Sequence, residues 1–189
     1  MKAFFNANKF PWVTFKNYWG CSTKSELIMD VVIPFVLGIL MVLFTTQTVS
    51  LFTTFIEKFQ GISGQVLTAV SILAGFNVAS ITIISTVQSD TIAKLKNEPS
   101  EENPKINMFE QLTIYFSWAV IIQLFVAFFS IILYYFASFI PSGIKEWGVP
   151  LWAWGIAVIW VGLAIHSIFI SIRNMKTLYY YVNFNPDKK

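Results

Sequence analysis

Four long stretches of the chain carry no charged residue. They are Val31–Ile56, Phe59–Ser89, Gln111–Ile144 and Trp147–Ile172. Each is longer than the roughly 20 mostly apolar residues that a helix needs to cross a bilayer. The stretches are solid apolar blocks, unlike the short alternating segments of a membrane β-barrel. The sequence therefore predicts an all-α membrane protein whose four transmembrane helices form one bundle.

Polar residues between these stretches set the expected helix bounds. We expect helices at about 27–56, 63–96, 109–140 and 150–173, within a single transmembrane domain over residues 27–178. Thr23 and Glu26 match a capping box for the first helix, and Pro34 predicts a kink inside it. Prolines and acidic residues give 97–108 the composition of a solvated loop.

Residues 1–26 form a leader in which aromatic and basic side chains are interleaved. Rings beside lysines suit the lipid headgroup layer, so we expect an amphipathic leader at the membrane interface; a loosely ordered tail is the alternative. Pro11 argues against one unbroken helix here. The residues concerned are Phe4, Phe5, Phe10, Trp12, Phe15, Tyr18 and Trp19 with Lys2, Lys9, Lys16 and Lys24.

The placement of basic residues predicts the orientation. Of the 13 lysines and arginines, all but Lys58 and Lys145 fall in the leader, in the connection between the second and third helices, or after the fourth helix. Cytoplasmic segments of membrane proteins carry such an excess. We therefore expect both termini, the loop 97–108 and the tail 179–189 to be cytoplasmic.

The composition is poor in catalytic groups. Only 12% of the residues are charged, against about 25% in an average soluble domain. One cysteine, Cys21, and one histidine, His166, cannot build a disulfide framework or a metal site. No Asp or Glu lies near His166 in the sequence to support a serine triad, and no phosphate-binding glycine loop occurs. We expect no catalytic residue, no metal and no cofactor, and a protein that is not an enzyme.

Two ionisable side chains lie near the predicted spans. Asp30 falls at the start of the first helix, where we expect it to reach water. His166 lies close to the cytoplasmic interface, where we expect it to satisfy its hydrogen bonds near the headgroups. A pH-sensing role for His166 is the alternative, because the pKa of a histidine lies near neutrality.

Small residues recur every three or four positions along the second helix. This spacing places them on one helical face, and small residues let helix backbones approach closely in lipid. The stripe therefore predicts helix packing, either within the chain or between chains. Its members are Gly64, Thr68, Ser71, Gly75, Ala79, Thr82 and Thr86.

Several polar side chains are expected at membrane depth. An amide without a partner in hydrocarbon costs several kcal/mol, so we expect interhelical hydrogen bonds, with the lining of a wet pore as the alternative. Asn77 and Gln123 lie at comparable depth. The full set is Gln47, Gln65, Asn77, Gln123, Ser130 and His166.

The loop between the second and third helices carries charges of both signs and is net acidic, which disfavours direct nucleic-acid binding. A mixed-charge cytoplasmic loop suits the docking of a soluble partner, with a solvated linker as the alternative. The expected docking residues are Lys94, Lys96, Glu98, Glu101, Glu102 and Lys105.

The whole layout resembles a known family. The leader, the segment Ile72–Ile81, the cytoplasmic loop and the start of the third helix at Phe116–Ala119 carry the resemblance. They are similar to KwaA, the membrane subunits of the Kiwa anti-phage defence system. The resemblance implies a homo-oligomer, a tetramer, in the bacterial inner membrane. It also implies a sensor of infection that works with a cytosolic, DNA-binding, KwaB-like partner.

We therefore expect a non-enzymatic, oligomeric inner-membrane sensor or scaffold that recruits a cytosolic effector in antiviral defence. Two alternatives remain. A small oligomeric ion channel or membrane-permeabilising protein would use the intramembrane polar residues to line a lumen. An assembly subunit of a larger membrane complex would be degraded without its neighbours.

Overall fold

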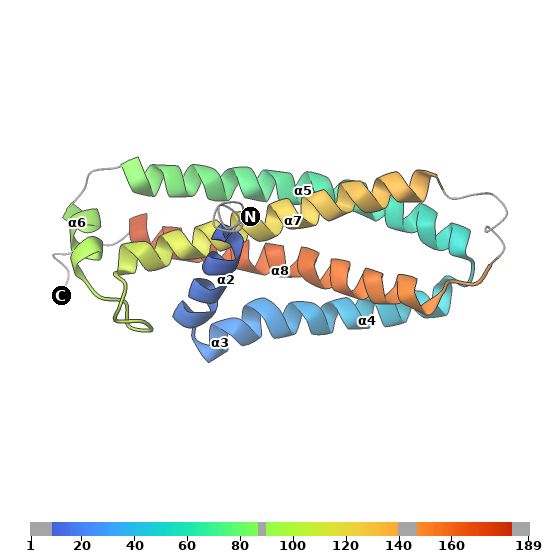
Figure 1. The fold of residues 1–189 in the computed structure, drawn as a ribbon, viewed down its shortest axis with the longest axis horizontal. Coiled ribbons are helices and arrows are strands. Elements are labelled where there is room, and N and C mark those ends of the chain that lie inside the picture. The colour runs from blue at the N-terminus through green and yellow to red at the C-terminus, as the bar shows by residue number, and fades with distance from the viewer. Residues whose placement is uncertain (1–8, 87–89, 140–146, 183–189) are drawn as a thin grey trace.

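The computed structural model describes residues 9–86, 90–139 and 147–182, and these contain helices and no β-strand. Figure 1 shows long helices lying side by side, with α7 (Met108–Ser138) and α8 (Leu151–Val182) between α5 (Phe52–Thr86) and α4 (Ile33–Thr48). Neighbouring pairs are α5 with α7, α7 with α8, and α8 with α4. The helices long and apolar enough to cross a membrane are Lys24–Thr48, Phe52–Thr86, Met108–Ser138 and Leu151–Tyr180. The predicted all-α, four-helix membrane bundle is confirmed.

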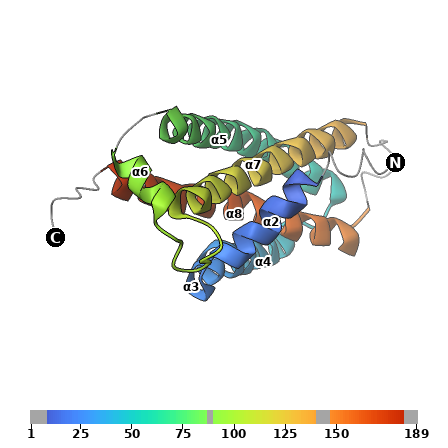
Figure 2. The same cartoon turned by 60° about the vertical axis from the view of Figure 1, so that its left-hand side comes forward.

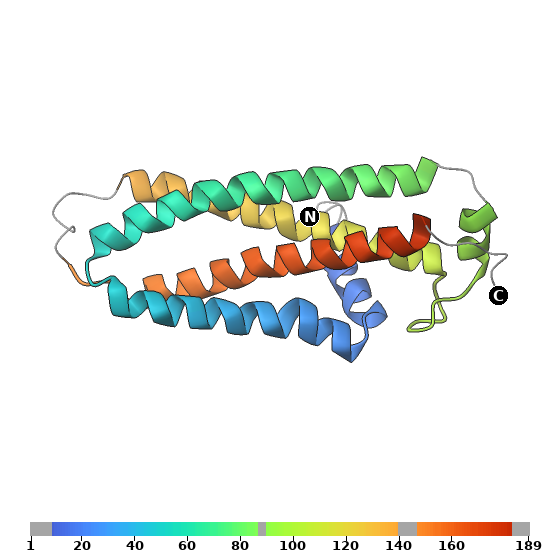
Figure 3. The same cartoon turned by 180° about the vertical axis from the view of Figure 1, so that it is seen from behind.

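The helix bounds differ from the sequence-based ones at two of the connections. The first helix ends at Thr48 instead of about residue 56, and α5 already begins at Phe52. The backbone turns at Val49, whose conformation is extended, and the Phe52 amide donates to the Trp147 carbonyl at 2.9 Å. Glu57 and Lys58 consequently lie inside α5. Figure 3 shows α4 and α5 meeting at this end and then diverging.

At the other end, the expected helix 63–96 corresponds to α5 and the short α6 (Asp90–Asn97), and residues 87–89 between them lie outside the described residues. The fourth helix is longer than expected, because α8 continues to Val182. The start of the segment 179–189, expected as a tail, is therefore helical. Residues 183–189 lie outside the described residues, as do residues 1–8 of the leader.

Within the leader, residues 10–21 form the helix α2 (Phe10–Cys21). Pro11 does not interrupt it because it lies in the first turn, where a helix needs no backbone N–H donor. Helix α2 contacts α7, and Figure 2 shows it running from beside α7 toward α3. The predicted capping box is present: Thr23 and Glu26 bond reciprocally and begin the short helix α3 (Lys24–Leu27).

The first membrane helix contains a π-helical turn, η1 (Ile28–Val32), between α3 and α4. Pro34 follows this turn directly and is buried. Because proline has no N–H, the carbonyl of Asp30 loses its regular helical donor four residues later. A backbone acceptor is thus left free inside the membrane domain, where it needs another donor.

Helices α4 and α8 approach each other closely at a pair of glycines. A Cβ at Gly38 would lie 3.0 Å from the Gly162 backbone nitrogen, and a Cβ at Gly162 would lie 2.7 Å from the Phe35 ring. A larger residue at either position would force its neighbour to shift, and at Gly38 the neighbour is the α8 backbone, so α4 and α8 pack closely here.

Candidate functional site

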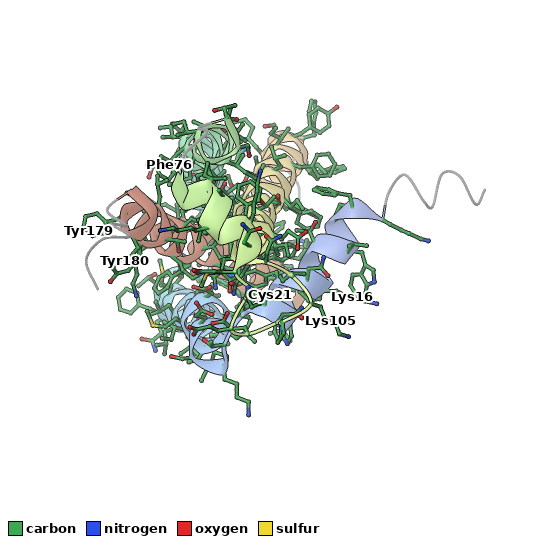
Figure 4. The ribbon with its side chains drawn as sticks, turned by 90° about the vertical axis from the view of Figure 1, so that its left-hand side faces the viewer. Lys16, Cys21, Phe76, Lys105, Tyr179 and Tyr180 are labelled. Atoms are coloured by element: carbon green, nitrogen blue, oxygen red, sulfur yellow. The ribbon has the colours of Figure 1, made fainter. Side chains whose placement is uncertain are left out.

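A buried polar core lies at the end of the bundle that carries α2, α6 and the loop 98–107. Figure 4 views the molecule from this end, with Cys21 near the centre and Lys16 and Lys105 nearer the edge. Side chains from α2, η1, α5, α7 and α8 contribute to the core. Its members, described in turn below, are Tyr18, Asp30, Asn77, Gln111, Tyr115, Gln123, His166, Ser171, Arg173 and Asn174.

An ion pair lies at the centre of this core. The Arg173 guanidinium Nη1 lies 2.6 Å from Asp30 Oδ2, and the two side chains are only 11% and 4% exposed. The Tyr18 hydroxyl donates to the same carboxylate oxygen at 2.9 Å. The guanidinium carbon also lies 4.1 Å from the ring centre of Tyr115 and 5.0 Å from that of Tyr18. One carboxylate and one guanidinium thus hold together side chains from four elements, α2, η1, α7 and α8.

The expectation that Asp30 reaches water is wrong. Asp30 is 3% exposed because α2 packs over it and places Tyr18 against its carboxylate. Burial is tolerable here because the charge has an opposite charge and a hydroxyl donor, without which it would be costly.

His166 supplies the donor for the backbone acceptor that Pro34 leaves free. Its Nδ1 contacts the Asp30 carbonyl oxygen, and the side chain is 4% exposed. Since a carbonyl only accepts, Nδ1 carries the hydrogen. His166 is therefore buried in the bundle, where it makes a specific hydrogen bond to the residue of the ion pair.

A second set of polar side chains continues the core along the bundle. Asn77 Nδ2 donates to Gln123 Oε1 at 3.2 Å, and Gln123 Nε2 donates to Ser171 Oγ at 2.6 Å. Asn174 Nδ2 donates to Asn77 Oδ1 at 3.0 Å. The structure therefore brings together Asn77 and Gln123, as their comparable depth predicted, and adds Ser171 and Asn174 on α8. These bonds connect α5, α7 and α8 at membrane depth.

The other intramembrane polar residues do not join this core. Ser130 is buried and accepts a hydrogen bond from Trp160 Nε1 at 3.0 Å. Gln47 lies exposed in the last turn of α4, and Gln65 lies exposed on α5. The six predicted residues are therefore spread over the bundle and do not gather in one cluster.

The polar core also ties the loop 98–107 to α2. The Cys21 carbonyl, at the end of α2, accepts from Gln111 Nε2 at 3.0 Å and from the Tyr115 hydroxyl at 2.5 Å. Gln111 Nε2 lies 2.8 Å from a carboxylate oxygen of Glu102 as well. The Cys21 side chain is fully buried, and burial raises the pKa of its thiol, against a smaller lowering by Asn103.

The predicted docking residues all lie on an exposed surface formed by α6 and the loop. The loop is held by its own backbone: Ser100 N–H donates to the Ile106 carbonyl at 2.9 Å, and Met108 N–H to the Glu98 carbonyl at 3.0 Å. Glu102 differs from the other docking residues because it also bonds Gln111. The surface is therefore presented on an ordered loop.

The small-residue stripe of α5 does not pack within the chain. All of its members are exposed except Gly64, which is half-buried, and a Cβ at Gly64 or Gly75 would have no neighbour within 4 Å. The inward face of α5 instead carries Ser63, Val70, Asn77 and Ile84. The intramolecular alternative for the stripe is therefore wrong. Packing between chains stays a prediction.

Sequence reasoning missed the residues that complete the core, namely Gln111, Tyr115, Ser171, Arg173 and Asn174. The sequence did contain one indication of the Asp30–Arg173 ion pair. Asp30 directly precedes the first uncharged stretch, and Arg173 directly follows the last one. In a bundle with both termini on one side, these two positions lie at the same end.

Among the described residues, no group of histidine, cysteine, aspartate and glutamate side chains could hold a metal ion. Comparisons with family models, curated proteins and solved structures found no match to this chain. What the protein does must therefore be argued from its own geometry.

Proposed function

We propose that this protein is a non-enzymatic, oligomeric sensor or scaffold of the bacterial inner membrane that recruits a cytosolic effector. The observation that carries the proposal is the Asp30–Arg173 ion pair and the Tyr18 hydroxyl that α2 adds to it. The pair joins the first and last membrane helices and at the same time holds the leader.

The contacts of the core give a route from membrane packing to the cytoplasmic surface. A shift of α4 against α8 would separate Asp30 from Arg173 and so release the Tyr18 contact that docks α2. The end of α2 bonds Gln111 and Tyr115 through the Cys21 carbonyl, and Gln111 bonds Glu102 in the loop. A change inside the bilayer would thereby alter the surface that the loop presents. Such a two-state element is what a sensing function requires.

The surface itself suits a charged soluble partner. Lys94 and Lys96 lie on α6, and Glu98, Glu101 and Lys105 lie in the loop, all exposed. Charges of both signs on an ordered loop favour a partner of complementary pattern, since charge complementarity sets specificity and the rate of encounter.

The resemblance to KwaA extends this proposal to a biological setting. The effector would be a KwaB-like cytosolic protein, and the stimulus would be infection of the cell by a phage. The outward stripe on α5 would serve the oligomer interface, because small residues permit close helix contact in lipid. The bilayer and further copies of the chain are the other expected partners.

The buried members of the polar set that motivated a channel form hydrogen bonds within the chain, whereas Gln47 and Gln65 are exposed. Asn77 and Gln123 bond each other, and Ser130 bonds Trp160. Side chains that are satisfied inside one chain do not need a wet lumen. The scaffold is for this reason the function that we favour.

The proposal is tested by isolating the protein from its native host in mild detergent and measuring the mass of the intact complex. We expect a multimer that carries a stoichiometric soluble protein. The double variant Glu98→Lys/Glu101→Lys should release that protein, whereas Lys24→Glu, an exposed charge reversal outside the loop, should not. A homo-oligomer without a companion would count against recruitment and would make ion conductance in liposomes the next measurement.

A further inference from the structure

A lateral groove opens between α4 and α5 at the end where the two helices are connected. From the connection 49–51 the helices diverge, and α8 lies between them as a floor, as Figure 3 shows from behind. The groove has a volume of about 210 Å³ and is lined by all three helices. Because it opens toward the side of the bundle, in a membrane it faces the lipid.

The groove is shaped by small and aromatic residues on α8. Ala157 and Ala164, both buried, leave space along the floor. Two ring pairs hold the α5 wall against the floor: Phe55 lies 4.8 Å from Trp154, and Phe59 lies 4.7 Å from Trp160, measured between ring centres. The groove is therefore a formed feature of the packing.

The size and chemistry of the groove suit a hydrocarbon chain. Its volume exceeds the ~150 Å³ of an apolar cavity that takes up benzene in a soluble protein. Apart from Thr45 and Lys58, its lining residues are apolar or aromatic. A space of this kind stays dry and is filled by apolar matter, which in a bilayer is a lipid acyl chain.

One cation lines the groove. Lys58 is exposed and lies six residues after the start of α5 at Phe52. At a rise of 1.5 Å per residue, this places it about 9 Å from the end of the helix. Among the described residues it forms no ion pair. It shares the groove with Trp154, and tryptophan is typical of the interface between headgroups and hydrocarbon. A lysine at that level can reach a lipid phosphate while its methylenes remain among apolar side chains.

A second apolar groove provides the comparison. It lies between α7 and α8, has a volume of about 300 Å³, and has no charged residue in its lining. Any acyl chain can occupy such a groove. Only a groove with a cation at its rim distinguishes an anionic headgroup from a zwitterionic one.

We propose that the groove between α4 and α5 binds an acyl chain of an anionic phospholipid whose phosphate is held by Lys58. The proposal does not depend on the proposed recruitment of an effector. It assigns this face of the bundle to a specific lipid rather than to bulk bilayer or to a second copy of the chain.

The test uses the full chain in nanodiscs that contain equal amounts of phosphatidylglycerol and phosphatidylcholine. Native mass spectrometry then counts the lipids that stay bound to the released protein. We expect phosphatidylglycerol to be retained in excess over its share of the bilayer. Lys58→Gln should lower this excess about fivefold, since a lysine near an anionic headgroup contributes about 1 kcal/mol. Lys94→Gln, which removes an exposed lysine on α6, should leave the excess unchanged.

A filling variant tests the groove itself. Ile62 lines the groove and is 50% exposed, whereas Ile159 lines the uncharged groove and is 58% exposed. Both changes are on the surface, so the folded core is undisturbed. Ile62→Trp should reduce the retained phosphatidylglycerol, and Ile159→Trp should not.

Two results would overturn the proposal. Retention of the two lipids in their bulk ratio, or an excess that survives Lys58→Gln, would show that the groove does not select an anionic lipid. A fall in the mass of the complex on Ile62→Trp, with lipid retention unchanged, would assign the groove to a second copy of the chain instead.

Discussion

Removing the Tyr18 hydroxyl should weaken the docking of α2 on the bundle. Tyr18 is 1% exposed, and its hydroxyl donates to Asp30 Oδ2 at 2.9 Å. Tyr18→Phe keeps the ring, its packing and its position 5.0 Å from the Arg173 guanidinium. The only loss is a buried hydrogen bond to a charged acceptor, which contributes about 1.5–3 kcal/mol. Since 1.4 kcal/mol is a factor of ten, the undocked population of α2 should rise about 10- to 150-fold.

Cys21 offers a built-in reporter of this undocking. It is the one cysteine of the chain, lies at the end of α2 and is fully buried. A thiol reagent can modify it only after the leader opens, so the labelling rate follows the open population when reclosing is fast. Burial also raises the pKa of the Cys21 thiol in the docked state. All variants are therefore compared at one pH. The exposed Cys21 thiol is then ionised to the same extent in each variant, and differences in labelling rate report the open population.

The control is Tyr180→Phe, which removes a hydroxyl from a side chain that is 61% exposed near the end of α8. It should leave the labelling rate of Cys21 unchanged. Arg173→Met adds a stricter comparison, because it leaves the Asp30 carboxylate buried without its cation and should increase labelling at least as much. If Tyr18→Phe raises the rate by less than twofold, the hydroxyl does not hold α2, and the proposed route from the ion pair to the loop loses its first step.

Three further predictions concern the bundle itself. Gly162→Leu should destabilise the fold by about 1–3 kcal/mol, because even a Cβ there would lie 2.7 Å from an aromatic ring on α4, whereas Gly155→Leu on the same helix has open space; thermal unfolding in detergent separates the two. Asn77→Leu should cost about 1–3 kcal/mol by leaving Gln123 without its donor, and Asn77→Leu/Gln123→Leu should cost less than the sum of the single changes in the same assay. Gly75→Leu should leave thermal unfolding of the chain unchanged but disrupt the oligomer in a native mass measurement, and an intact oligomer would remove the stripe from the interface.

The sequence by itself determined the class of the protein and the approximate position of each span. Apolar stretches such as Gln111–Ile144 are longer than a bilayer requires, and this property depends only on the local chain. The capping box at Thr23 and Glu26 could also be predicted from the sequence, because both partners lie within one helical turn.

The turn between α4 and α5 could not be predicted from the sequence. The stretch Val31–Ile56 has no charge that would mark a break, yet the first helix ends at Thr48. A backbone contact of Phe52 with Trp147, nearly a hundred residues away, accompanies that turn. Hydropathy carries no information about such a contact.

Only the tertiary structure decided which face of each helix is inside. The stripe at Gly64 and Gly75 has the spacing of a packing face, but the close backbone contact is made by Gly38 and Gly162. In lipid, both faces of a helix meet an apolar environment, so apolar periodicity does not mark the core as it does in water.

In the buried core, too, the sequence indicates some features and the tertiary structure alone decides others. The sequence indicates that Pro34 frees the Asp30 carbonyl, but not that His166 would supply the donor. Asp30 and Arg173 are recognisable as charges beside membrane spans, but their burial depends on α2 folding back over the bundle. A charge can be buried only where opposite charge and donors converge on it, and that convergence arises from the packing of helices far apart in the chain.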